Sequence, residues 1–300
     1  MKRNRLPHYT CLIKGKELRL DWLSSVSVND YPAARPLDWH EHDEIEVIFP
    51  VRGNFHYEFR DAQPVDVDGN SFVCIPPGTW HRLRDAIDAP GNRFSLHLRR
   101  NMRGMRAGAL TPSEYKRVYD RLLELQGTRL SLSPTQKMAT TNLWKLVCRH
   151  KSGHPDIDIP KVRLLVCQLL CECESPTERT PAKASDEIIA EAKKWLCRNI
   201  ANGVNLDDLV SLIGYSRVRL FSLFKDYTGQ TPGEYLRGLR VEKAKCLLSG
   251  SSQTSADIAR ACGLGDPAHF CRLFRKMTGL TPMGWRRLKG VLPPVSTGSD

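Results

Sequence analysis

Residues 257–282 read DIARACGLGDPAHFCRLFRKMTGLTP, and a related stretch lies about 50 residues earlier in the same chain. The earlier copy, residues 206–232, reads LDDLVSLIGYSRVRLFSLFKDYTGQTP. An offset of 49 residues aligns Gly214 with Gly263, and one extra residue in the second copy brings the two Thr-Pro pairs into line. Self-similarity of this kind indicates two copies of one structural unit.

Each copy predicts a short helix, a tight turn and a second helix. Glycine accepts the positive φ that a tight turn needs, so Gly214 and Gly263 are expected to end the first helix. The second helix is expected to stop at Gly229 and Gly279, where a Thr-Pro pair caps and begins the next helix. This order is the signature of a helix-turn-helix unit.

The second helix of each copy has one apolar face. The residues predicted to form it are Leu220, Leu223, Phe224 and Tyr227 in the first copy and Phe270, Leu273, Phe274 and Met277 in the second. Any packed helix needs such a stripe. The repeat therefore leaves two alternatives open, a pair of DNA-reading units or a tandem hairpin that contacts only proteins.

The second copy resembles the signature of the AraC/XylS family of transcription regulators, over residues 257–264 and 269–282, almost position for position. The resemblance covers about residues 186–287. It implies two helix-turn-helix units joined by a long helix at residues 232–248, whose second helices enter successive major-groove segments of double-stranded DNA.

The resemblance also implies which residues face the DNA. The groove-facing candidates are Arg217, Val218, Phe221 and Ser222 in the first unit and Ala268, His269, Cys271 and Arg272 in the second. Arg272 is the main candidate for reading a base, because a guanidinium can bond guanine in two places. The residues expected to contact phosphates are Arg219, Lys225, Arg275 and Lys276.

The first unit departs from the family pattern. Many members carry a polar or basic residue where this chain has Phe221 and Ser222. Two alternatives stay open: Phe221 contacts a thymine methyl group, or the first unit contributes little specificity.

The charge of the chain fits a polyanionic partner. The 300 residues carry a formal net charge of +12, and residues 186–290 hold 17 Lys and Arg against 10 Asp and Glu. Charge alone does not separate a DNA binder from a binder of anionic membranes. No apolar run approaches the roughly 20 residues that span a bilayer, and no signal peptide follows the basic start. We therefore expect a cytoplasmic protein with no membrane partner.

The amino-terminal third predicts β-structure. Residues 45–49, 55–59, 71–75 and 94–98 predict short strands separated by turns, as in an antiparallel barrel or sandwich. Helices are expected from Thr111-Pro112 onward and near residues 134–150 and 159–173.

A histidine-rich motif precedes the predicted strand at residues 45–49. His40, His42 and Glu46 have even numbers, so on one continuous strand they would point to the same face. The corner Pro76-Pro77-Gly78 then delivers a further imidazole, His81.

These residues resemble the two motifs of the cupin family, HxHxxxE and PxGxxH. The second motif departs from the pattern, because Asp85 replaces the usual asparagine. The resemblance implies that the residues matched to His40, His42, Glu46 and His81 hold iron, manganese or a similar metal, which suits imidazole and carboxylate ligands. Two other uses stay open, a polar effector pocket without metal and a purely structural role. His56 and His97 are further candidates for the pocket.

The predicted fold class is therefore an α+β multidomain chain. Its expected parts are a cupin-like effector-sensing β-barrel at 1–105, a helical connector and dimerisation region at 106–174, a linker at 175–184, an all-α double helix-turn-helix domain at 185–290 and a flexible tail at 291–300.

The predicted function is sequence-specific transcription regulation, with DNA binding modulated by a small molecule in the barrel. Expected partners are DNA, the small-molecule effector, RNA polymerase and a second copy of the chain. We expect no enzymatic activity and no resident cofactor, with a divalent metal in the barrel as the one exception left open. The alternative is a metal-dependent cupin enzyme with an accessory DNA-binding domain.

Overall fold

The computed structural model describes residues 11–88, 90–100, 110–125, 127–151, 158–174, 184–201 and 203–289. It divides into two compact units, one of residues 1–31 and 37–180 and the other of residues 32–36 and 181–300. The predicted tail, and all but the last residue of the predicted linker, lie outside the described residues.

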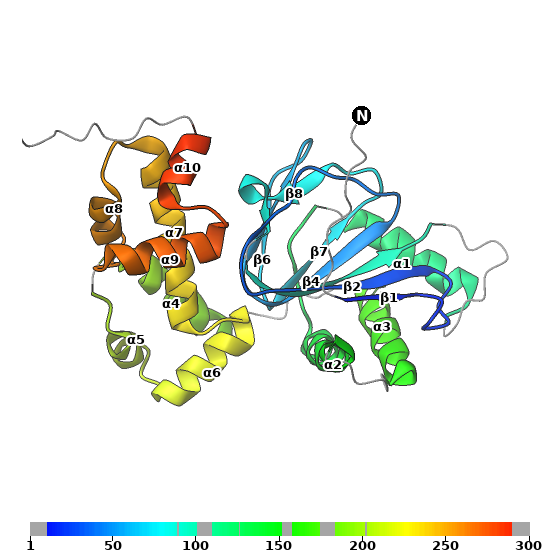
Figure 1. Ribbon diagram of the computed structural model, residues 1–300. Coiled ribbons are helices and arrows are strands. Elements are labelled where there is room, and N and C mark those ends of the chain that lie inside the picture. Colours follow the sequence, from blue (N-terminus) through cyan, green and yellow to red (C-terminus); the bar gives the residue numbers. More distant parts are fainter. Residues whose placement is uncertain are drawn as a thin grey trace, which may run out of the picture. The chain divides into compact units, whose positions relative to one another are not determined.

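The first unit is built around a six-stranded antiparallel sheet in the order β1-β2-β10-β4-β7-β11, with a second sheet in the order β6-β5-β8 (Figure 1). The strands are β1 (Cys11–Lys14), β2 (Leu23–Tyr31), β4 (Ile45–Arg52), β5 (Phe55–Phe59), β6 (Val65–Val67), β7 (Ser71–Ile75), β8 (His81–Leu83), β9 (Ile87–Asp88), β10 (Gly91–Leu98) and β11 (Leu130–Ser131). A 3-10 turn, η1 (Arg84–Ala86), precedes β9, and β3 (Arg35–Pro36) lies in the segment grouped with the second unit. All four predicted strands are confirmed.

The two faces of the six-stranded sheet pack against different partners. Because side chains alternate along a strand, Val47 and Phe49 on β4 face one core and Ile48 faces another. The first core is completed by three helices, α1 (Pro112–Glu124), α2 (Pro134–Lys151) and α3 (Ile159–Glu174). These helices, expected as a connector, therefore share one hydrophobic core with the sheet.

The opposite face of the six-stranded sheet meets β5, β6 and β8, and part of it is polar. On β10 the apolar Phe94 and Leu96 face the helices, whereas the alternating Arg93, Ser95 and His97 face the other way and are still buried. The unit is thus two facing sheets with helices on one side. Among the described strands no ring of hydrogen bonds closes, so the structure shows a mixed α/β unit and no closed barrel.

The second unit consists of helices. They are α4 (Ala184–Arg198), α5 (Leu206–Ile213), α6 (Arg217–Thr228), α7 (Pro232–Gly250), α8 (Ser255–Ala261), α9 (Pro267–Thr278) and α10 (Pro282–Leu288). The four predicted turn glycines, Gly214, Gly229, Gly263 and Gly279, all have φ between 70° and 76°. Both predicted Thr-Pro helix starts are confirmed, because the threonine side chains cap α7 and α10.

The two copies repeat each other in side-chain packing as well. Phe224 of α6 meets Tyr235 of α7 edge to face at 5.5 Å, and Phe274 of α9 meets Trp285 of α10 edge to face at 5.9 Å. Such aromatic pairs add about 0.5–1.5 kcal/mol beyond the area they bury. In both copies the turn threonine also donates its hydroxyl to the carbonyl of that phenylalanine at 2.8 Å. Each second helix is therefore anchored to the helix that follows it.

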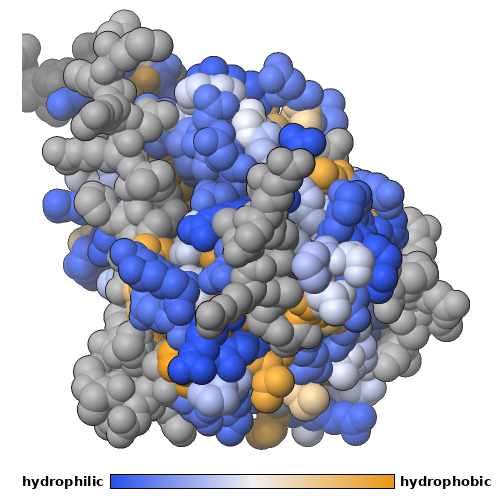
Figure 2. Space-filling view, turned by 90° about the vertical axis from the view of Figure 1, so that its right-hand side faces the viewer, coloured by the Kyte–Doolittle hydropathy of each residue, from blue (hydrophilic) through white to orange (hydrophobic). Residues whose placement is uncertain are grey.

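The surface of the first unit is mixed. The coloured residues in Figure 2 are mostly hydrophilic, with small hydrophobic patches between them. Within the described ranges, no helix is both long and apolar enough to cross a membrane.

Gly263 and Gly214 provide a matched pair for testing the turn. A Cβ at Gly263 would lie 2.6 Å from the carbonyl oxygen of Ile200, whereas a Cβ at Gly214 would meet nothing within 4 Å. We expect Gly214→Ala to lower the free energy of unfolding by about 1–2 kcal/mol through backbone strain alone. Gly263→Ala should lower it by about 2–4 kcal/mol, because steric crowding is added. Urea denaturation measures both, and an equal cost at the two positions would contradict this account.

Candidate functional site

The predicted DNA-facing residues of the first copy all lie on α6. Leu220 and Phe224 are buried on its inner side. Five of the six candidates are exposed, namely Arg217, Val218, Arg219, Ser222 and Lys225, and the sixth, Phe221, is half-buried. Val218 is the most prominent of them, because 82% of this apolar residue is exposed.

The six candidates of the second copy lie on α9 in the same manner. Phe270, Leu273 and Phe274 are buried. The exposed candidates are Ala268, His269, Arg272, Arg275 and Lys276, and Cys271 is half-buried. The structure thus places all twelve predicted residues on the outer faces of two equivalent helices.

Weak surface contacts hold one arginine on each of these helices. The guanidinium of Arg217 pairs with Asp207 and lies 4.8 Å from the centre of the Phe221 ring. Arg272 lies 3.9 Å from a carboxylate oxygen of Asp266. Exposed ion pairs contribute only about 0–1 kcal/mol, so a phosphate or a base can replace either carboxylate at little cost.

The second candidate site lies between the two sheets of the first unit, where backbone hydrogen bonds bring the histidines together. The amides and carbonyls of His40 and His81 bond each other at 3.1 and 3.0 Å, and the amide of Gly78 donates to the carbonyl of His42 at 2.8 Å. Gly78 has φ +70°, a conformation that glycine adopts without strain. The corner at Gly78 therefore carries His81 to the loop that holds His42.

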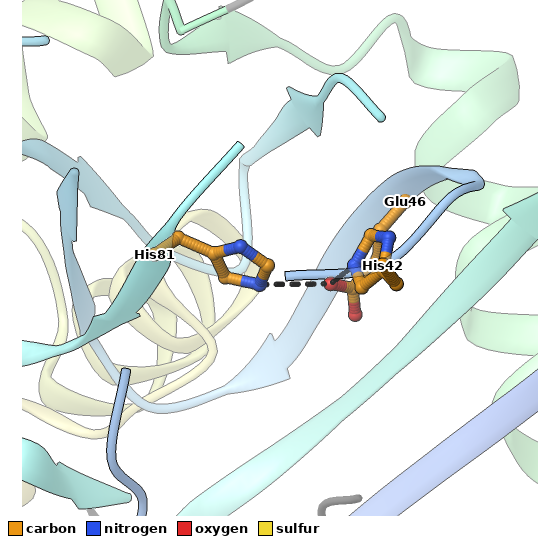
Figure 3. Close-up of side chains that lie close together, drawn as sticks. All are labelled: His42, Glu46 and His81. Atoms are coloured by element: carbon orange, nitrogen blue, oxygen red, sulfur yellow. Dashed lines mark hydrogen bonds and ion pairs between the residues drawn. The ribbon is translucent and has the colours of Figure 1, made fainter. Parts of the chain in front are cut away.

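Glu46, at the start of β4, is the centre of this cluster. Its Oε2 atom lies 3.2 Å from Nε2 of His42 and 3.5 Å from Nε2 of His81, as Figure 3 shows. Its Oε1 atom lies 3.8 Å from Nε2 of His97, the residue paired with Glu46 across β10 and β4. Glu46, His81 and His97 are buried.

The cluster shifts the ionisation of its members. Burial disfavours the charged form of Glu46, but His42, His81 and His97 around it outweigh that effect and hold its pKa well below the ordinary value. Burial also acts against protonation of His42, yet its hydrogen bond to Glu46 leaves its pKa raised. Burial and the neighbouring His81 lower the pKa of His40. Glu46 is thus an ionised carboxylate inside the protein.

The expected strand alternation does not place His42 beside Glu46. The strand β4 begins at Ile45, as predicted, so residues 41–44 precede it and loop hydrogen bonds bring His42 beside Glu46. His56 lies outside the cluster, where it bonds Asp66 at 2.6 Å and Arg84 at 2.8 Å.

His40 lies at the edge of the cluster, and His97, a further candidate of the sequence, lies inside it. The His40 ring lies 4.2 Å from the His81 ring, centre to centre, but the group whose ligand atoms all lie within 4.8 Å of one another consists of His42, Glu46 and His81. His97 approaches Glu46 directly, and its Nε2 lies 3.1 Å from the hydroxyl of Ser27. The polar residues at alternate positions of β10 were the sequence signal for this inward face.

Known proteins resemble this chain over different lengths. A family described as a helix-turn-helix domain matches residues 209–288. The transcriptional activator RhaS of Citrobacter koseri is 30% identical over 258 residues, which are 84% of this chain and 88% of that protein. The transcriptional regulator YisR of Bacillus subtilis is 22% identical over 248 residues, 81% of this chain and 85% of its own.

Solved structures also resemble parts of this chain. An AraC-type transcriptional regulator from Chromobacterium violaceum is 31% identical, with a TM-score of 0.34, over 38% of this chain and 97% of that one. The similarity to RhaS extends over most of both proteins, and the helix-turn-helix family matches residues that span both copies of the repeat. The chain belongs to the AraC family of DNA-binding helix-turn-helix transcriptional regulators.

Proposed function

We propose that this regulator reads DNA with the outer faces of α6 and α9 and senses a small molecule at the Glu46 cluster. The observation that supports DNA reading is the packing of the two helices. Each buries its phenylalanine against the next helix, at Phe224 and Phe274, and so turns the twelve candidate residues outward. Helices of this kind fit the major groove.

The outer faces divide into base-reading and phosphate-binding parts. Arg272 reads a base, because its side chain is 71% exposed and its guanidinium is held only loosely by Asp266. Val218 is the apolar reader of the first unit in place of Phe221, since Phe221 is half-buried and covered by Arg217. The residues that bind phosphates are Arg219, Lys225, Arg275 and Lys276.

The proposed sensing role rests on the buried polar side chains between the two sheets. A buried carboxylate surrounded by imidazoles is costly to maintain without a ligand or a compensating charge. We propose a cupin-like arrangement in which the two facing sheets enclose the effector beside Glu46, His42, His81 and His97, with His40 behind His81. Effector binding alters DNA binding only if the effector has different affinities for two states of the protein.

Two further partners follow from the same proposal. RhaS is a transcriptional activator by name, which supports RNA polymerase as a partner of this chain. Met138 of α2 and Leu164 of α3 are exposed large apolar residues on the helical side of the first unit, which supports a homodimer through these helices. The relatives are transcriptional regulators and give no support to the cupin-enzyme alternative.

Arg272 and Arg260 allow a controlled test of base reading. Both side chains are 71% exposed and both lie beside an aspartate, but Arg260 is on α8 and not on a reading helix. We expect Arg272→Ala to weaken binding to the preferred duplex by about 1–3 kcal/mol, or roughly tenfold to a hundredfold, and to relax the preference at one base pair. Arg260→Ala removes the same charge and should leave the base preference intact.

The measurement has two stages. Selection from random duplexes with the purified full-length protein gives the preferred site, and fluorescence anisotropy then gives affinities on that site and on a scrambled duplex. Lys276→Ala should weaken binding to both duplexes equally and reduce the salt slope by about one. An Arg272→Ala protein that keeps full discrimination between the two duplexes would contradict the proposal.

A further inference from the structure

The helix α4 packs with the first copy of the repeat, but the backbone after it lies beside the second copy. The buried core that α4 shares with the first copy consists of Ile189, Ala192, Leu196, Leu209, Leu220, Phe224 and Leu236. The helix ends at Arg198, and the carbonyl oxygens of Ile200 and Ala201 then lie next to the turn at Gly263. A Cβ on Gly263 would be 2.6 and 3.2 Å from these two oxygens. The backbone that follows α4 therefore brings the two copies into contact.

The equivalent turn of the first copy is not covered in this way. A Cβ on Gly214 would meet no described atom within 4 Å, although the two glycines have nearly the same φ, 74° at Gly214 and 70° at Gly263. The positive φ explains why both turns carry glycine, but it does not explain why only one of them is covered. The covering of Gly263 therefore belongs to the way the two copies are joined, and not to the helix-turn-helix unit itself.

Two basic side chains of α7 bind carbonyl groups at helix ends from both copies. Nε of Arg240 donates to the carbonyl oxygen of Ile200, just after α4, at 3.2 Å. Nζ of Lys243 donates to the carbonyl oxygen of Ala261, the last residue of α8, at 2.7 Å. Residues three positions apart lie on the same face of a helix. One face of α7 therefore binds the end of α4 from the first copy and the end of α8 from the second.

The surroundings of Arg240 make its contact resistant to rotation. A charged donor at the carboxyl end of a helix gains both a hydrogen bond and attraction to the negative end of the helix dipole. Arg240 is half-buried, and its Nη2 lies 3.0 Å from the position that a Cβ on Gly263 would take. The guanidinium thus occupies the space beside this glycine while it binds Ile200. We call this set of three residues, Ile200, Arg240 and Gly263, the junction.

We propose that the junction fixes the rotation of α9 relative to α6, and that it thereby sets the spacing of DNA half-sites that the regulator accepts, with Arg240 as the positioning residue. The inference rests on the proposed reading of DNA by α6 and α9. A turn of the duplex takes about 10–10.5 base pairs, so one added base pair rotates a half-site by about 35°. Two readers held rigidly lose one set of base contacts on such a duplex, whereas readers with a loosened junction follow the displaced half-site.

The test measures the affinity of the full-length protein for a series of duplexes. Base substitution in the selected duplex locates the two half-sites, and the series adds or removes one or two base pairs between them. Wild type should lose about tenfold or more in affinity on each altered duplex, because one reader loses its base contacts. Arg240→Met keeps a long apolar side chain without the guanidinium, and it should bind the whole series with nearly equal affinity. Arg240→Lys keeps a cation that can donate to Ile200 and should retain most of the wild-type preference.

Two matched controls separate the junction from charge and from turn strain. Arg237 is exposed and lies three residues before Arg240 on α7, so Arg237→Met removes the same charge and should leave the spacing preference intact. Gly263→Ala disturbs the junction from its other side and should weaken the preference, whereas Gly214→Ala should not. Thermal unfolding checks that every variant is folded at the temperature of the assay.

The outcomes distinguish failure of the junction from failure of DNA reading. A folded Arg240→Met protein that still loses as much affinity as wild type on the altered duplexes would overturn the role of the junction, while DNA reading by α6 and α9 would stand. Equal affinity of wild type for every spacing would overturn it as well, and so would an equal loss of the preference in Arg237→Met, because charge alone would then explain the effect. A wild type without preference for any duplex would overturn DNA reading and the junction together.

Discussion

The edge-to-face contacts of Phe224 with Tyr235 and of Phe274 with Trp285 determine which residues of α6 and α9 lie on the surface of the second unit. Each contact fixes the rotation of one reading helix about its axis, because the phenylalanine can occupy its buried position in only one orientation. Rotation in turn decides which residues face outward. The glycine that ends each of these helices and the threonine that caps the next one hold the phenylalanine and its partner at the right separation. In the proposed mode of DNA reading, recognition thus depends on an apolar contact that lies away from the DNA.

In the first unit, the alternation of side chains along β4 and β10 gives the two faces of these strands different surroundings. One face of these strands joins the helices in a large apolar core, while the other turns Glu46, Arg93 and His97 into the space between the sheets. Arg93 is neutralised by two hydrogen bonds to Asp88, at 2.6 and 2.8 Å. The ion-pair contacts of Glu46 within the described residues are with the imidazoles of His42, His81 and His97. This difference is the reason that we propose Glu46 as the place where an effector acts.

Local chemistry explains which parts of the structure could be predicted from the sequence. The helix-turn-helix repeat was predictable in detail, because Gly214, Gly263 and the two Thr-Pro pairs dictate backbone conformation within a few residues. Strands such as β5 and β7 were predictable for the same reason. Whether the sheets close into a barrel could not be predicted, because strand pairing joins residues far apart in sequence. Likewise, the approach of His97 to Glu46 depends on the cross-strand register of β10 and β4.

The most direct test of the central claim, that α6 and α9 offer their outer faces to DNA, is hydroxyl-radical footprinting of the full-length protein read by mass spectrometry. It reports the solvent exposure of individual side chains with and without the selected duplex. The account predicts that Val218 on α6 and His269 on α9 lose reactivity when the duplex is bound, while Leu12 on β1 does not change. Unchanged reactivity of both Val218 and His269 at saturating duplex would contradict it.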